Sequence, residues 1–218
     1  LAKIAISMAL LDKEQEALGY PATGWLSKVF QSIQTAVGPD PTVQHTLRII
    51  AFNYDRLIEY RLAAMAANSW GIEPTKAIEW STEFVSHVYG ELCGEMQWNK
   101  DNRRFQIIDN SDSHHSDAAK TLFAIGEERQ SPRKDLDRSR EWLRAAHRII
   151  FLGFGFDELN LNELGFVRDW LSARDKCWWR NCELISTAYG FSDQWKHRIE
   201  KRIVPSDISA SKMRWAEP

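Results

Sequence analysis

Four short runs rich in apolar residues recur along this chain as candidate strands, and residues with helical spacing lie between them. The four runs are 47–52, 84–92, 148–156 and 182–188. Continuous apolar runs of this length are typical of parallel strands that are buried on both faces. Alternation of such strands with helices predicts an α/β fold. We expect a Rossmann-like, mostly parallel sheet with helices on both faces and with ligands at the carboxyl ends of the strands.

Apolar residues at helical spacing predict helices over 2–18, 25–36, 57–67, 134–147 and 193–202. A polar stretch at about 99–133 is expected to form an excursion with a small hairpin or strand. We expect one domain over residues 1–218. Because the chain begins with Leu1 rather than Met, we also expect it to be a piece of a longer protein.

Composition excludes several classes of protein. Hydrophobic residues make up 44% and the formal net charge is -2, as in soluble globular proteins without a field that would attract nucleic acid. No apolar run approaches the ~20 residues of a membrane span. The three cysteines form no CxxC pair, and paired histidines in a polar loop, His114 and His115, are more often solvated than metal-bound. We therefore expect a cytoplasmic protein with no metal, no membrane contact and no direct nucleic-acid binding.

The first two strand ends carry the candidate catalytic residues. Asn53 and Asp55 follow the first strand directly; alternatively, Asn53 is a turn residue and Asp55 caps the next helix. On the second strand, the alternation of side chains predicts that His87 and Tyr89 share one face. His87 is either a general base or ribose anchor, or a structural histidine satisfied by hydrogen bonds.

The strand 148–156 runs into a glycine loop. Gly153 and Gly155 alternate with Phe154 and Phe156, and Asn160 lies shortly downstream. Glycines at a strand end permit a dinucleotide to approach the backbone closely, although a tight turn alone would also use them.

Taken in order, these strand ends resemble the motifs of the sirtuin-like (silent information regulator two-like) family. Asn53-Tyr54-Asp55 resembles the strand end that lies beside the nicotinamide ribose, and His87 to Leu92 resembles the strand that ends in the catalytic His-Gly. Gly153 to Phe156, with Asn160, is similar to the loop on the adenosine side of NAD. The resemblance implies that the three strands are adjacent and parallel around one cleft.

The chain departs from the family pattern at three points. Tyr89, which the resemblance makes a further candidate contact of NAD, occupies the usual place of the histidine, with His87 two residues earlier. No Gly-Ala-Gly segment precedes Asn53. The paired CxxC motifs of the deacylase zinc module are absent, because Cys93 is the single cysteine within residues 91–152. The resemblance therefore favours the branch that hydrolyses free NAD, with NAD as substrate and no metal.

The resulting expectation is an NAD glycohydrolase that depletes NAD in antiphage defence, as in abortive infection. The alternatives are a catalytically inactive module that binds NAD or ADP-ribose or supports assembly and, less favoured, a zinc-free deacylase. Ten tryptophans, including Trp178 and Trp179, indicate a covered apolar surface. We therefore expect a homo-oligomer or a complex with a companion ATPase, nuclease or Argonaute-like subunit.

Overall fold

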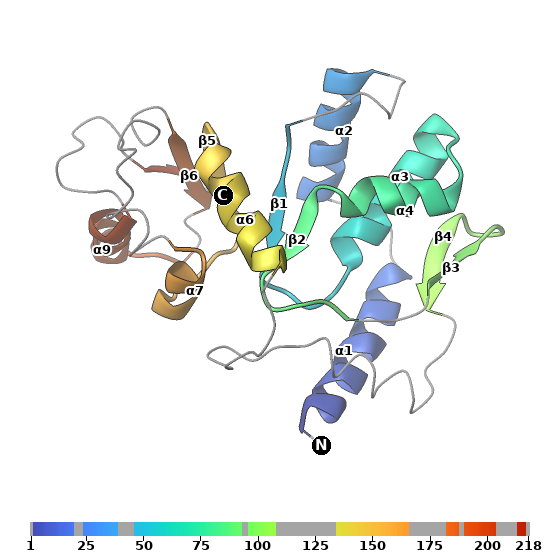
Figure 1. The fold of residues 1–218 in the computed structure, drawn as a ribbon, viewed down its shortest axis with the longest axis horizontal. Coiled ribbons are helices and arrows are strands. Elements are labelled where there is room, and N and C mark those ends of the chain that lie inside the picture. The colour runs from blue at the N-terminus through green and yellow to red at the C-terminus, as the bar shows by residue number, and fades with distance from the viewer. Residues whose placement is uncertain are drawn as a thin grey trace. The chain divides into compact units, whose positions relative to one another are not determined.

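The computed structural model describes residues 2–19, 24–38, 46–92, 96–107, 134–165, 182–187, 190–203 and 213–216 (Figure 1). The chain divides into two compact units, residues 1–127 and residues 128–218, and each is described by itself. Both contain helices and small parallel sheets. The expected α/β class is confirmed at this level. The single domain and the Rossmann-like architecture stay predictions.

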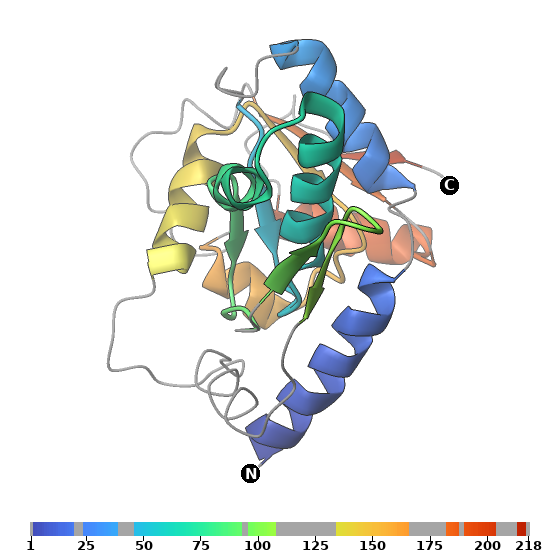
Figure 2. The ribbon, with the colours of Figure 1, turned by 90° about the vertical axis from the view of Figure 1, so that its right-hand side faces the viewer.

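The first unit contains four helices and four strands within the described residues. These are α1 (Ala2–Leu18), α2 (Trp25–Val37), β1 (Ile49–Ala51), α3 (Leu57–Trp70), α4 (Pro74–Thr82), β2 (Val85–His87), β3 (Met96–Asn99) and β4 (Arg104–Ile107). Strands β3 and β4 form an antiparallel hairpin, green in Figure 2, that contacts α1 and α3.

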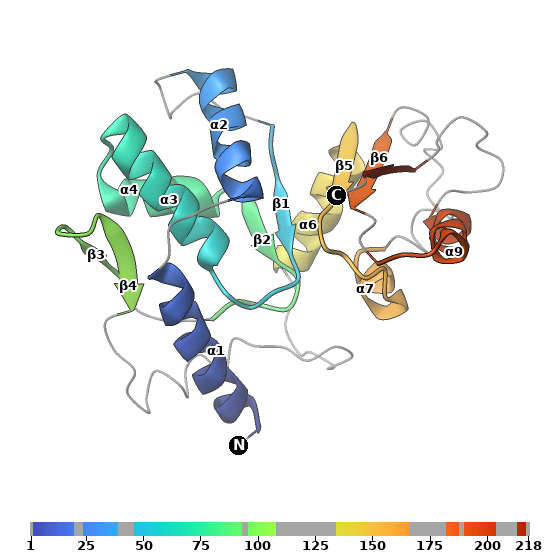
Figure 3. The same ribbon diagram turned by 180° about the vertical axis from the view of Figure 1, so that it is seen from behind.

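Strands β1 and β2 run parallel and side by side, as Figure 3 shows. Ile49 pairs with Val85, and Ala51 pairs with His87 at the carboxyl end of the pair. The predicted parallel pairing of the Asn53 strand with the His87 strand is thus confirmed. Their loops must leave the same edge of the sheet, which places residues 52–55 beside residues 88–91.

The helices of the first unit enclose an aromatic and aliphatic core. Phe30 of α2, Trp70 of α3, and Trp80 of α4 meet with ring centroids 5.2–6.5 Å apart, and Phe84 continues the cluster. Edge-to-face packing of this kind adds about 0.5–1.5 kcal/mol per pair beyond the area buried. Helix α3 carries small buried residues, including Ala63 and Ala66, where it packs against α4. This core fixes α3, and therefore its first turn, against the end of β2.

The second unit contains three helices and a three-stranded parallel sheet within its described residues. The elements are α6 (Lys134–Ala145), β5 (Arg148–Phe151), α7 (Glu158–Glu163), β6 (Glu183–Thr187), α9 (Asp193–Ile203) and β7 (Arg214–Ala216), and the strand order is β5-β6-β7. The buried face of the sheet carries Ile149, Phe151 and Leu184. The placement of β5 relative to β1 and β2 stays a prediction.

Several elements differ from the sequence-based expectation. Strand β2 ends at His87, and residues 88 and 89 form a turn, so the predicted alternation that put His87 and Tyr89 on one strand face is wrong. Helices α4 and α7 and strand β7 were not expected. Of the polar stretch 99–133, only the part up to residue 107 is described, and it forms the turn and second strand of the hairpin. None of the described helices is long and apolar enough to cross a membrane.

Candidate functional site

The Asn53 loop (Asn53 to Asp55) leaves the carboxyl end of β1 and is held mainly through main-chain atoms. The main-chain oxygen of Asn53 accepts a hydrogen bond from Nδ1 of His87 at 2.8 Å. The oxygen of Tyr54 accepts one from the N–H of Leu92, also at 2.8 Å. Asp55 Oδ1 accepts from the N–H of Leu57, 3.3 Å away, at the start of α3. The N-cap residue of α3 is Arg56, whose side chain makes no capping hydrogen bond, so the alternative that Asp55 is the N-cap is wrong. Asn53 itself is exposed.

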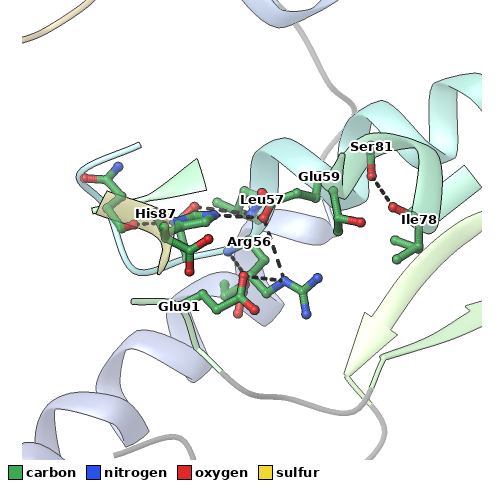
Figure 4. A network of polar contacts seen from close by, with 12 residues as sticks. Arg56, Leu57, Glu59, Ile78, Ser81, His87 and Glu91 are labelled. Carbon is green, nitrogen blue, oxygen red and sulfur yellow. Dashed lines mark hydrogen bonds and ion pairs between the residues drawn. The ribbon is translucent and has the colours of Figure 1, made fainter. Parts of the chain in front are cut away.

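His87 is buried, with 4% of its surface exposed, and both of its ring nitrogens have partners. A carbonyl can only accept, so Nδ1 carries a proton toward Asn53. Nε2 lies 2.8 Å from Oε1 of Glu59, which is 1% exposed and belongs to the first turn of α3. Figure 4 shows His87 and Glu59 facing one another across the end of β2.

The contact between His87 and Glu59 is a charged pair. Burial alone would lower the pKa of His87, but the hydrogen bond and the negative charge of Glu59 oppose it. Together with the carbonyl of Asn53 and the charge of Glu91, they raise the pKa of His87 to about 9. At neutral pH the ring is therefore an imidazolium that donates from both nitrogens, and neither nitrogen is free to accept a proton from a substrate. Of the two interpretations of His87, this geometry favours the hydrogen-bonded structural histidine over the general base.

Arg56 and Glu14 extend the network. The guanidinium Nε of Arg56 lies 3.8 Å from Glu59 and 3.5 Å from Glu91, and the guanidinium stacks 4.9 Å above the ring of Tyr60. The main-chain N–H of Arg56 donates to Oε1 of Glu14, 2.5 Å away in α1. Burial raises the pKa of Glu14 to about 7 despite this hydrogen bond. Carboxylates from α1 and α3 thus converge on the segment that follows the Asn53 loop.

Glu59, His87 and Glu91 have ligand atoms within 4.8 Å of one another, a spacing that a metal ion could bridge. However, Arg56 already contributes positive charge to both carboxylates, and His87 adds a second cation. A divalent ion at this place would lie beside a guanidinium at low dielectric, where like charges repel strongly. We therefore describe these residues as an ion-pair network and assign no metal to them.

Tyr89, which stands where the family has its histidine, is buried rather than presented to solvent. Its ring packs edge-to-face on Phe52, with centroids 5.9 Å apart. Strand β2 has ended by this point, so Tyr89 lies in the turn that follows the strand.

The glycine loop of the second unit follows β5. Gly153 has a positive φ of 61°, and its N–H donates to Oγ1 of Thr187 at 3.1 Å. A side-chain carbon added at Gly153 or Gly155 would meet no atom within 4 Å, so the backbone of the loop is open to close approach. Phe154 and Phe156 pack on Phe151, with centroids 5.6 and 5.0 Å away.

Asn160 lies in α7. Asp157 is the N-cap of this helix, and its side chain accepts from the N–H groups of Leu159 and Asn160. Asn160 is half-buried. The contact of these residues with adenosine stays a prediction.

Within the first unit, the structure brings together Asn53, Asp55 and His87, as the sequence predicted. Sequence reasoning missed Glu59 and Glu14. The helical spacing of apolar residues could have located both glutamates, because each lies on the buried face of its helix. Glu59 precedes the buried alanines of α3 by four and seven residues, and Glu14 lies between the buried Leu11 and Leu18 of α1.

Comparison of the chain with protein-family models, with curated proteins and with solved structures gave no match. The resemblance to the sirtuin-like family therefore rests on the motifs alone.

Proposed function

We propose that this protein hydrolyses NAD to nicotinamide and ADP-ribose, as an NAD-depleting effector in antiphage defence. The observation that carries the proposal is the Asn53 loop, in which an exposed amide side chain stands at the carboxyl end of a parallel strand with its main chain fixed from the neighbouring strand. In α/β folds this is the place where ligands bind. The parallel sheets of both units support the Rossmann-like architecture included in the proposal.

Hydrolysis of NAD requires few catalytic groups. Water attacks C1′ of the nicotinamide ribose as the C1′–N bond breaks; the electron pair of that bond neutralises the pyridinium, and the attacking water releases a proton to solvent. Because nicotinamide leaves as a neutral molecule, no general acid is required. The oxocarbenium-like transition state is stabilised by nearby oxygen atoms. Asn53 and Asp55 supply amide and carboxylate oxygens, and His87 contributes through its hydrogen bonds.

In the second unit, Gly153 to Phe156 and Asn160 are proposed to bind the adenosine half of NAD. The open space above both glycines and the neighbouring rings of Phe154 and Phe156 support this assignment. Tyr89 is proposed as a further contact of NAD, at the side of the Asn53 loop where its ring packs on Phe52.

A second candidate is a catalytically inactive module that binds NAD or ADP-ribose. Two observations favour it: both ring nitrogens of His87 are occupied, and Tyr89 is buried in the family's histidine position. This candidate predicts ligand binding without turnover.

The test compares Asn53→Ala with Asn102→Ala in the full-length protein. Asn102 is an exposed asparagine in the β3–β4 turn and serves as the matched control. We expect release of nicotinamide to fall by at least about tenfold in Asn53→Ala, equivalent to about 1.4 kcal/mol of transition-state stabilisation, and to be unchanged in Asn102→Ala. Equal rates for both variants would reduce Asn53 to a turn residue. NAD binding without any turnover in the wild type would establish the second candidate instead.

A further inference from the structure

We propose that Glu59 and His87 act together as positioning residues for the Asn53 loop, with Glu59 orienting His87 and His87 fixing the main-chain oxygen of Asn53. Glu59 acts only through His87 and touches no substrate. The task assigned to the loop rests on the proposed NAD hydrolysis, whereas the anchoring itself does not.

Two hydrogen bonds of 2.8 Å form a continuous connection from helix α3 through β2 to the loop. His87 lies 28 residues after Glu59 and 34 residues after Asn53 in the chain. Each link is directional, because the ring of His87 can reach Asn53 and Glu59 only with its plane in one orientation. A helix that is fixed by the core thereby determines the position of a loop atom.

Stability alone does not explain why an ion pair stands at this place. An apolar pair of the same size is often as stabilising as a buried ion pair, or more so. Moreover, Oε2 of Glu59 is buried without a hydrogen-bond partner, and the lost hydration of that atom is destabilising. What an apolar pair could not provide is a donor to the oxygen of Asn53. The specific contribution of the pair is therefore the position of the loop.

The remaining anchors of this segment also act on main-chain atoms. Leu92 donates to the oxygen of Tyr54, and Glu14 accepts from the N–H of Arg56. The exposed side chain of Asn53 is thus presented by a backbone that is bonded on both sides. The exchange of the Leu92 amide with solvent reports whether this backbone is in place.

Two substitutions of His87 separate the links. The amide nitrogen of an asparagine lies near the position of histidine Nδ1, and that of a glutamine lies near Nε2. His87→Asn therefore keeps the bond to Asn53, whereas His87→Gln keeps the contact with Glu59 and loses Asn53. The experiment measures Leu92 amide exchange, kcat and KM for both variants in the full-length protein.

We expect Leu92 exchange to be roughly tenfold faster in His87→Gln, and nearer to wild type in His87→Asn, because one lost hydrogen bond changes an equilibrium by about that factor. The fall in kcat should follow the same order, with little change in KM. A general base would predict a different result, namely equal loss of kcat in both variants with Leu92 protection intact, and that result would overturn the proposal.

Glu59→Gln tests the second link with the smallest change in shape, and it remains informative if the histidine variants fail to fold. The matched control is Glu79→Gln, an exposed glutamate on α4. We expect Glu59→Gln to lower the pKa of His87, measured from the ¹⁵N chemical shifts of its ring, and to speed the exchange of the Leu92 amide. The control Glu79→Gln should change neither quantity.

The two proposals fail in distinguishable ways. Wild-type Leu92 exchange in both His87→Gln and Glu59→Gln would overturn the anchoring, whatever the activity. If the wild type releases no nicotinamide but the variants still differ in Leu92 exchange, the proposed NAD hydrolysis fails and the anchoring stands.

Discussion

Nε2 of His87 lies 2.8 Å from Oε1 of Glu59, and almost none of either side chain is exposed. In the folded protein this pair lets His87 keep its proton up to a higher pH than in the unfolded chain. The stability of the protein therefore depends on pH.

The first prediction concerns that dependence. The charged groups that act on His87 are Glu59 and Glu91. Arg56 lies beside both carboxylates, and Glu14 interacts with Arg56, Asp55 and Glu59. Since the pKa of His87 is raised from 6.5 to about 9 on folding, the folded protein binds more protons between these values. The free energy of unfolding should therefore be highest below about pH 6.5 and fall by up to about 3 kcal/mol as the pH rises to about 9.

Urea denaturation at a series of pH values measures this fall. The control is His87→Asn, which should flatten the profile between pH 6.5 and 9. An unchanged slope in that variant would assign the dependence to another group.

The second prediction concerns Glu14. Burial raises its pKa from 4.5 to about 7, so its contribution to stability is complete below about pH 4.5 and is lost as the pH rises through about 7. Glu14→Gln retains an oxygen for the N–H of Arg56 without the buried charge. At pH 8 this variant should be more stable than wild type by roughly 1–3 kcal/mol, since it avoids the desolvation of a carboxylate.

Thermal denaturation at pH 8 and at pH 4.5 checks the second prediction, and the gain should vanish at the lower pH. Glu16→Gln, on the exposed side of the same helix, is the matched control and should change the melting temperature little.

The third prediction separates the two glycines of the second unit. Gly153 has a positive φ and Gly155 does not, yet both have open space where a side chain would stand. Gly153→Ala should therefore destabilise the protein by about 1–2 kcal/mol. Gly155→Ala should leave stability nearly unchanged but weaken NAD binding, because a methyl group would stand between the backbone and a closely approaching ligand.

Calorimetric titration with NAD, run beside thermal melts of both variants, distinguishes these effects. Unchanged NAD affinity in Gly155→Ala would show that no ligand approaches the loop closely at residue 155.

The fourth prediction concerns assembly. Ile150, Leu152, Leu159 and Trp195 of the second unit are each about half exposed. Because soluble monomers seldom leave large apolar patches uncovered, we expect self-association or docking on a companion subunit. Trp178 and Trp179, which first suggested such a surface, lie outside the described residues. Light scattering on the full-length protein should give more than the monomer mass, and a strict monomer that hydrolyses NAD at full rate would contradict the expectation.

The sequence predicts the helices of this protein better than its strands. Helix α1 has the predicted bounds and α2 differs by one residue, because their apolar residues recur at helical spacing. Strand β2 is much shorter than the apolar run 84–92 that predicted it, since residues beyond His87 are buried in a turn rather than in a strand. Apolar residues in a sequence predict that a stretch is buried. In this stretch they do not tell whether the buried residues form a strand or a turn.

The candidate site shows a similar division. Asn53, Asp55 and His87 could be found from their places at strand ends, but the hydrogen bonds that define His87 could not. They depend on Glu59, which enters from a helix whose glutamates are usually solvated. Only its position ahead of Ala63 and Ala66 on the buried stripe of α3 indicates otherwise. Helical spacing therefore locates such a residue, whereas its partner follows only from the tertiary structure.

The hydrogen bond from His87 is accepted by the main-chain oxygen of residue 53, so it does not depend on which side chain that residue carries. A single substitution there could remove an enzymatic activity and leave the architecture untouched, and another could restore it. Two copies of this unit, one a catalyst and the other a sensor of the same nucleotide, would then have superimposable folds and differ in one exposed group.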